Sequence, residues 1–470
     1  MSATRFVDVS FTDGQSAAWA GALEAPMLCA AAQSLDGARF AAIEAISPEV
    51  MSQCLSRGEN PLQRLEDIRR WAPTARLRAV VDLIPRHGRF DELGTGLLRA
   101  WLRLLAEKGV SEVVLVDPWG DLGRMTRAIR LSKEQGLEPI AALVYPTGAS
   151  QAHDELAQLA QAFVKGGAAR IMLRDEAGLL STGDLGALIP TLRAAIGPAE
   201  LDLHTHCHTG LGPQVALEAI RLGIARLDTV LPCVANGPSL PSSLHMSHSA
   251  ALLGLEIQGV ATQPVEEANA ALLRVAAQEN FPESQPWAFD LAHFMAALPG
   301  PLAARAMQAA KACGRDGFHR FAKECESVRR ELGQPPMLGP YAEDVMKMAL
   351  SHLAGAPRFG RIYPSMRRLL QQKGGGFSQA ALHLRQRVGR SETTREAPPP
   401  PNDETGLLAM MCGIAPAGVP ARQQKHYELM SPEEALTQGL LARWATYPSL
   451  TVTGPGLHIQ LSHSRGAQSC

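Results

Sequence analysis

The sequence predicts an α/β protein, a parallel (β/α)8 TIM barrel followed by an α-helical domain. Short runs of β-branched residues, leucine and alanine alternate with segments of helical periodicity as far as residue 262. Successive runs start roughly 30 residues apart, which is the length of one βα unit. From about residue 265 to residue 375 the pattern is helical, without strands. Eight such units fit a closed barrel better than an open, doubly wound sheet.

The expected strands share a short apolar core and begin at Arg5, Phe40, Leu77, Glu112, Pro139, Arg170, Leu201 and Arg226. Between them, residues 96–108 (GLLRAWLRLLAEK) place apolar side chains at helical spacing. Gly109 follows as a signal that ends the helix. After the barrel, further helices are expected at 266–278, 301–313, 317–332, 343–353 and 363–372.

The chain therefore divides into four parts. Residues 1–262 form the barrel and residues 263–376 the helical domain. Residues 377–404 include four consecutive prolines and are expected to be a disordered linker. The tail, residues 405–470, contains one expected helix (432–443) and one expected strand (456–462), and no function can be assigned to it.

Composition excludes several classes of protein. The 470 residues include 45 Lys and Arg against 46 Asp and Glu, a net charge of −1, which argues against a nucleic-acid surface or a polybasic membrane anchor. There is no apolar run long enough to span a membrane, and no basic segment precedes the Ala-rich stretch at 16–35 as in an export signal. The eight cysteines include no Cys-x-x-Cys pair. We therefore expect reduced thiols and a cytoplasmic location.

Polar residues stand at the ends of the predicted strands. The carboxyl ends of barrel strands converge on one face, where active sites are built. A packed core would not require the polar residues found at these ends, which are Asp13, Glu44, Asp82, Asp117, Tyr145, Arg174, Asp175, His204, His206 and Thr229. They predict a functional site at the mouth of the barrel.

The segment His204-Thr205-His206 is the sharpest of these signals. Side chains at i and i+2 of a strand point to the same side, so the two imidazoles can bind one metal ion. Asp13 follows strand 1, which lies near strand 7 across the mouth of a closed barrel. The alternative is a structural ion pair between Arg174 and Asp13, in which the guanidinium takes the place of the metal.

Six segments carry a resemblance to a known family: DVSFTDGQS (8–16), GENPLQRL (58–65), LRDEAGLLS (173–181), LDLHTHCHTGLGP (201–213), LDTVLP (227–232) and RRELGQPPMLGP (329–340). On these segments, residues 5–375 resemble the carboxyltransferase component of biotin-dependent enzymes. That family includes the catalytic domain of pyruvate carboxylase, the oxaloacetate decarboxylase alpha subunit and the central subunit of transcarboxylase.

The resemblance implies a divalent metal (Zn, Mn, Co or Mg) held by an Asp, two His and a carbamylated Lys. Asp13, His204 and His206 stand at the matching positions, but Arg174 occupies that of the lysine and cannot be carbamylated. Two neighbouring positions also depart from the family pattern. Thr12, before Asp13, stands where the family has an Arg, and Cys207, after His206, stands where the family has an Asp.

The resemblance also implies residues for the substrate, a 2-oxo acid that the family holds with an Arg and a Gln. Gln15 approximately matches the Gln. The Arg position falls on Asp82, and Arg86 is near enough to reach the same mouth. The Thr that moves a proton between biotin and the enol falls on Ser243. Because the cationic clamp is replaced by Asp82, pyruvate is not assumed to be the substrate.

Biotin is expected on a separate carrier. The segment Val345-Met346-Lys347-Met348 looks like a biotin attachment site, but residues 340–354 are expected to be helical and lack the hairpin that presents a target lysine. The resemblance implies biotin carboxyl carrier and biotin carboxylase subunits as partners, a small carbonyl substrate and a homo-oligomer.

Three functions remain open at this stage. The first is a carboxyltransferase-like enzyme that transfers CO2 through a metal-stabilised enolate. The second is a metal-dependent aldolase or lyase of the same barrel superfamily that needs no biotin. The third is a non-catalytic paralogue that pairs with an active homologue through its helical domain. Arg174 is either a clamp for a substrate carboxylate or a block to the metal site.

Overall fold

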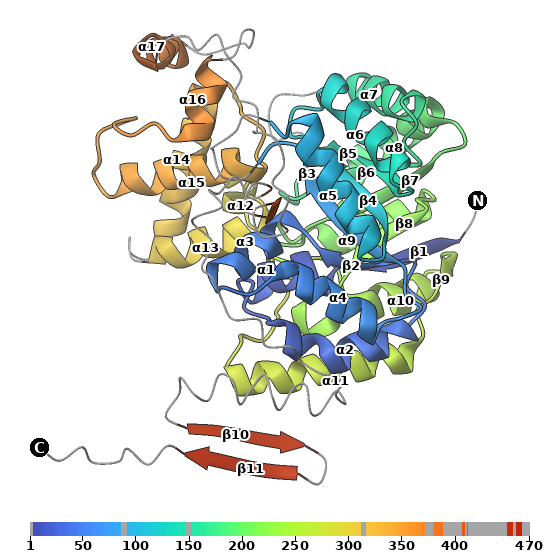
Figure 1. Ribbon diagram of the computed structural model, residues 1–470. Helices are drawn as coiled ribbons and strands as arrows, with labels where there is room; N and C mark the ends of the chain where they lie inside the picture. The colour runs from blue at the N-terminus through green and yellow to red at the C-terminus, as the bar shows by residue number, and fades with distance from the viewer. Residues whose placement is uncertain are drawn as a thin grey trace, which may run out of the picture.

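The computed structural model describes residues 3–85, 92–145, 153–311, 316–371, 379–388, 407–408, 411, 449–454 and 457–462. Its first part is a closed parallel barrel, shown in blue to green in Figure 1. The strands are β1 (Thr4–Asp8), β2 (Ile43–Ile46), β3 (Leu77–Asp82), β4 (Val110–Val116), β5 (Glu138–Val144), β6 (Arg170–Asp175), β7 (Glu200–Thr205) and β8 (Arg226–Thr229). The barrel closes where β1 pairs with β8, from Arg5 opposite Arg226 to Asp8 opposite Thr229, and with β2 at Asp8 and Ile43. The predicted TIM barrel is confirmed.

Helices follow the strands and cover the outside of the barrel. They are α1 (Gln15–Ala18), α2 (Ala25–Asp36), α3 (Pro48–Ser56), α4 (Pro61–Trp71), α5 (Thr95–Glu107), α6 (Leu122–Glu134), α7 (His153–Lys165), α8 (Thr182–Ile196), α9 (Gly212–Arg221) and α10 (Ser243–Leu252). A π-helical turn, η1 (Ser10–Gly14), follows β1, a 3-10 turn, η2 (Pro232–Val234), follows β8, and the short β9 (Ile257–Gln258) pairs with β1. Local sequence explains helix ends. Ser181 and Asp184 form a capping box at the start of α8, and Gly109 takes a φ of 85° after α5.

The interior of the barrel has an apolar half and a charged half. The apolar half is made by inward side chains of β3 to β6, namely Val80, Val114, Val116, Ile140, Ala142 and Met172, while their chain neighbours pack outward under the helices. The charged half carries buried Glu44, Arg78, Glu112, Asp202, Arg226 and Asp228 from β2, β3, β4, β7 and β8. Charges inside a barrel are costly unless paired, so this half requires a network of partners.

Residues beyond the barrel are helical, as predicted. The helices are α11 (Thr262–Glu279), α12 (Leu291–Ala296), α13 (Gly300–Ala310), α14 (Gly317–Glu331), α15 (Gly339–Leu353), α16 (Pro364–Gln371) and α17 (Gln379–Val388). Helices α12 to α16 surround a second apolar core, which also takes in Ile84 after β3. This helical part appears in yellow and orange beside the barrel in Figure 1.

The division of the chain differs in two places from the one expected. Helix α11 lies along α2, and its buried Val265 and Leu272 belong to the barrel core (Figure 1). The second core therefore begins at Ala292 rather than near residue 263. Part of the predicted linker, Gln379–Val388, is helix α17, because this stretch is rich in alanine and leucine and precedes the prolines.

Little of the tail is described. A hairpin of β10 (Ser449–Gly454) and β11 (Leu457–Ser462) includes the predicted strand, whereas the helix expected at 432–443 lies outside the described residues. Within the described part of the chain, no helix combines the length and the apolar character needed to cross a membrane.

The helical surroundings of Lys347 lead to a prediction about biotin. Lys347 lies in the third turn of α15 and pairs with Glu343 one turn earlier at 2.9 Å. A target lysine must sit on an exposed hairpin, so we expect no biotin on Lys347 after co-expression of this chain with a biotin ligase. Intact-mass measurement checks this, with a biotin carrier domain as the positive control. A mass increase that peptide mapping places on Lys347 would contradict the prediction.

Candidate functional site

The carboxyl ends of β1 and β7 bring together Asp13, His204 and His206, called here the trio. Asp13 lies in η1, directly after β1, while His204 lies in β7 and His206 just beyond it. The Asp13 Oδ2 atom is 3.3 Å from Nε2 of each histidine. One ligand atom from each of the three residues lies within 4.8 Å of the others, and among the described residues this is the group so arranged. The structure therefore places these three predicted residues side by side.

The backs of both imidazoles are held by acceptors. His204 Nδ1 is 2.9 Å from Asp228 Oδ2, and His206 Nδ1 is 2.8 Å from the carbonyl oxygen of Pro238. Carbonyl and carboxylate oxygens accept hydrogen bonds, so each Nδ1 carries a proton, and each Nε2 faces Asp13. His204 Nε2 is buried and makes no hydrogen bond. Two imidazole nitrogens and one carboxylate oxygen thus converge on one point, which requires a proton or a cation there.

Electrostatic coupling within the trio follows from this convergence. Burial opposes the charged forms of Asp13 and His206, but the Asp13 carboxylate raises the pKa of His206. In return His206 and His204 hold the pKa of Asp13 well below its usual range, against the effect of burial. The Asp13 carboxylate therefore favours positive charge, from a proton or a cation, between itself and His206.

A buried ion network lies beneath His204. Arg78 donates two hydrogen bonds to Asp228, at 2.8 and 2.6 Å, and its guanidinium also lies 2.8 Å from Glu44. Glu44 in turn accepts a 2.6 Å hydrogen bond from the Thr12 hydroxyl. Burial alone would raise the pKa of Asp228, but Arg78 and His204 lower it below its usual range. The carboxylate that orients His204 is therefore kept ionised.

Arg174 has a closer partner than the predicted one. Its Nη2 lies 3.7 Å from Asp13 Oδ2, so the predicted ion pair exists, but its Nε donates to Glu176 Oε1 at 2.6 Å. Glu176 directly follows Asp175, the last residue of β6. The guanidinium therefore lies between two carboxylates and does not replace the histidines as the partner of Asp13.

The other predicted site residues have different surroundings. The Gln15 amide accepts from the Leu23 backbone N–H at 3.3 Å and lies 3.4 Å from Gln53, and it makes no hydrogen bond to the trio. Ser243 is the first residue of α10, with a buried hydroxyl that has no partner. Asp82 is the last residue of β3, and Arg86 lies outside the described residues.

Sequence reasoning missed the residues that support the trio. Arg78 and Asp228 are charged residues that alternate with apolar ones in buried strands, and that is the signal that could have drawn attention to them. Pro238 acts through its backbone carbonyl, which no side-chain pattern reveals. Asp117 and Asp175, which also stand at strand ends, form hydrogen bonds within loops. Asp117 accepts from the Trp119 N–H, and Asp175 accepts from two backbone N–H groups after β6.

The helical part of the chain also reaches the site. Gly300, the first residue of α13, donates its N–H to the Glu176 carbonyl at 3.1 Å. A Cβ atom on Gly300 would lie 1.8 Å from the Pro238 carbonyl oxygen and 2.3 Å from His206 Nδ1. Only glycine allows α13 to begin against the hydrogen bond that orients His206.

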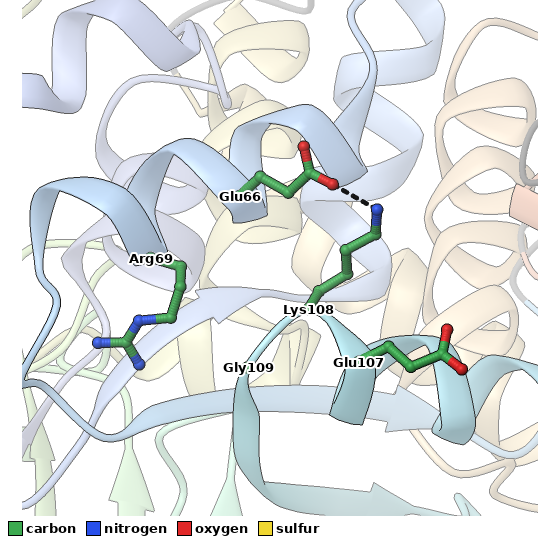
Figure 2. Close-up of a pocket in the computed structure, with 5 residues that line it drawn as sticks. All are labelled: Glu66, Arg69, Glu107, Lys108 and Gly109. Carbon is green, nitrogen blue, oxygen red and sulfur yellow. Dashed lines mark hydrogen bonds and ion pairs between the residues drawn. The ribbon is translucent and has the colours of Figure 1, made fainter. Parts of the chain in front are cut away.

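A surface hollow lies at the opposite end of the barrel (Figure 2). Glu66, Arg69, Glu107, Lys108 and Gly109 line it, and Gly109 directly precedes β4, so the hollow faces the amino ends of the strands. Lys108 is engaged in an ion pair with Glu66 across the hollow. Active sites of such barrels lie at the other face, so the hollow is not part of the site.

Comparison with known proteins places this geometry in context. The chain is 24% identical over 365 residues to a pyruvate carboxylase subunit of Methanocaldococcus jannaschii, covering 76% of this chain and 63% of that protein. It is 22% identical to the 2-oxoglutarate carboxylase large subunit of Hydrogenobacter thermophilus, covering 78% and 57%. A methylmalonyl-CoA carboxyltransferase 5S subunit, from Propionibacterium freudenreichii subsp. shermanii, is 22% identical over 68% of this chain and 63% of that subunit. The chain thus resembles the carboxyltransferase components of biotin-dependent carboxylases.

Solved structures agree on the fold. The carboxyl transferase domain of Rhizobium etli pyruvate carboxylase, solved with pyruvate, superposes with a TM-score of 0.76 at 18% identity, covering 94% of this chain and 77% of that one. No protein-family profile matches the sequence. The chain spans less than two thirds of the length of the curated relatives named above. The resemblance expected from the sequence is confirmed by these relatives, and the fold by the solved structures.

The close approach at Gly300 leads to a prediction about stability. In Gly300→Ala the new Cβ atom overlaps with the Pro238 carbonyl and the His206 ring, so both must move away from α13. We expect this overpacking to lower the free energy of unfolding by about 1–3 kcal/mol or more. Urea denaturation followed by circular dichroism measures this.

Gly186→Ala is the matched control. Gly186 is exposed within α8, and a Cβ there meets nothing within 4 Å. Replacing glycine by alanine inside a helix should raise stability by about 0.5–1 kcal/mol. Equal effects of the two substitutions would show that Gly300 is not under steric constraint.

Proposed function

We propose that this chain is a carboxyltransferase subunit that moves CO2 between carboxybiotin on a separate carrier and a 2-oxo acid or related carbonyl compound. The observation that carries the proposal is the convergence of Asp13, His204 and His206 at the mouth of a carboxyltransferase-type barrel. The names of the relatives support the reaction class, and the partners inferred from them are a biotin carboxyl carrier and a biotin carboxylase.

The trio fits a divalent cation (Zn, Mn, Co or Mg). Each imidazole has its Nδ1 bound to an oxygen behind it, the arrangement usual for metal-ligating histidines, and His204 Nε2 lacks any other partner. Asp13, His204 and His206 would hold the ion, which leaves positions open for a substrate oxygen. When bound there, such an ion polarises a carbonyl and stabilises the negative charge of an enolate.

The residues of the chain supply orientation and charge around this point. Asp228 fixes the tautomer and the ring direction of His204, and Arg78 keeps Asp228 ionised. Arg174 contributes positive charge beside Asp13, suited to a substrate carboxylate. Ser243 is proposed as the proton shuttle, with its buried hydroxyl free of other hydrogen bonds. Gln15, Asp82 and Arg86 are proposed to contact the substrate.

The apolar half of the barrel interior limits the size of the substrate. Leu338, in the loop before α15, belongs to the same apolar cluster as the interior residues of β3 to β6. The helical part therefore closes over one side of the mouth, next to the strand that ends in Asp82. This enclosure favours a small carbonyl compound, and Asp82 disfavours a carboxylate on that side.

Metal binding is the first test of the proposed function. We expect purified chain to retain about one divalent ion, and the variant His204→Ala/His206→Ala to lose it because two of three ligands are gone. Elemental analysis of protein prepared without chelators measures the ion. His319→Ala is the control, since His319 is exposed in α14. Equal metal content in the wild type and the double variant would refute the site.

Turnover is the second test. We expect CO2 release from a panel of 2-oxo acids only when a biotinylated carrier is added, with a loss of at least about 100-fold in the His204→Ala/His206→Ala variant. His319→Ala should keep the wild-type rate. Cleavage of a carbonyl substrate without carrier would instead indicate a biotin-independent aldolase or lyase. Absence of turnover, with stable binding to an active homologue, would indicate a non-catalytic partner subunit.

A further inference from the structure

A further carboxylate, that of Glu176, lies beside the trio. Glu176 is mostly buried, with 12% of its side chain exposed, and its Oε1 accepts the 2.6 Å hydrogen bond from Arg174 Nε. Its backbone carbonyl accepts from Gly300 N–H, which ties the loop after β6 to the start of α13. Glu176 is thus held in place from both the barrel and the helical part.

Arg174 creates an electrostatic problem for a cation in the trio. Its guanidinium stays ionised at all relevant pH values, and its Nη2 is 3.7 Å from the Asp13 oxygen that would bind the cation. The two histidines are neutral when they act as ligands. Taken with Arg174 alone, the trio therefore has a net charge of zero, which would attract a divalent ion weakly.

We propose that Glu176 is the residue that allows the trio to hold a divalent cation next to Arg174. Its carboxylate neutralises the guanidinium at 2.6 Å and holds the Nε side of Arg174 away from Asp13. Asp13 then keeps its full charge for the ion. This inference rests on the proposed metal site and adds a residue that the trio does not include.

Glu176 acts through Arg174 and not as a ligand. The group of converging ligand atoms comprises Asp13, His204 and His206 without Glu176, and the Glu176 oxygen is occupied by Arg174. Glu176 is therefore a positioning residue, and its effect on metal affinity must depend on the presence of Arg174. That dependence separates it from a fourth ligand.

The experiment is a double-mutant cycle on the full chain, read by metal binding. Mn2+ affinity of metal-stripped protein is measured by calorimetry for the wild type, Glu176→Gln, Arg174→Met and Arg174→Met/Glu176→Gln. We expect Glu176→Gln to weaken binding by about 10- to 100-fold, the usual effect of losing a residue that supports metal ligands. In the Arg174→Met background the same change should matter less than about threefold. Glu155→Gln, an exposed position on α7, is the charge control and should leave affinity unchanged.

The outcomes are distinct. Unchanged affinity in Glu176→Gln, while the wild type binds Mn2+, would overturn the inference and leave the metal site standing. An equal loss in both backgrounds would also overturn it, since Glu176 would then be a ligand. A wild type that binds no divalent ion would refute the proposed site itself. Circular dichroism and thermal melting of each variant show whether it is folded, and an unfolded Arg174→Met is replaced by Arg174→Gln in the cycle.

Discussion

The buried pair of Arg78 and Asp228 is the interaction on which the site depends. Both side chains are fully inside the barrel, and two hydrogen bonds of 2.8 and 2.6 Å join them. Removing one partner of such a pair costs about 3–5 kcal/mol, because the other charge is left buried and unpaired. The pair holds His204 from behind, and through Glu44 it also holds Thr12, next to Asp13. The buried charges are therefore paired, and the same hydrogen bonds orient His204 and fix the turn that carries Asp13.

The helical part completes the mouth of the barrel. Gly300 lies against the His206 hydrogen bond, and Leu338 packs into the apolar half of the interior. Trp119, in the loop after β4, donates to the Tyr341 hydroxyl in α15 at 3.0 Å and packs edge-on against its ring. Three separate contacts thus join the helices to the strand ends. Movement of one part relative to the other would change the position of His206 and the space above the trio.

Charge at the mouth is balanced around Arg174. A guanidinium near Asp13 suits an anionic substrate but opposes a metal ion, and Glu176 at 2.6 Å makes the two compatible. The ion pairs join four carboxylates, of Asp13, Glu44, Glu176 and Asp228, with two guanidinium groups, of Arg78 and Arg174, so the formal charges sum to −2. A divalent cation would neutralise them. This arrangement differs from a lysine carbamate, since all of the negative charge comes from ordinary side chains.

The sequence by itself determined the barrel, the helical part and the trio. Strand periodicity repeats in every βα unit, the i and i+2 spacing puts His204 and His206 on one side, and barrel closure brings β1 near β7. Only the tertiary structure decided which groups support them. Asp228 hydrogen-bonds to His204, 24 positions away, Pro238 hydrogen-bonds to His206 through its backbone carbonyl, and Gly300 of α13 lies against the Pro238 carbonyl and the His206 ring. Such contacts depend on how strands and helices pack at distances of a few ångströms, and no local pattern encodes them. For the same reason the sequence named Asp13 as the partner of Arg174, while the closer partner is Glu176.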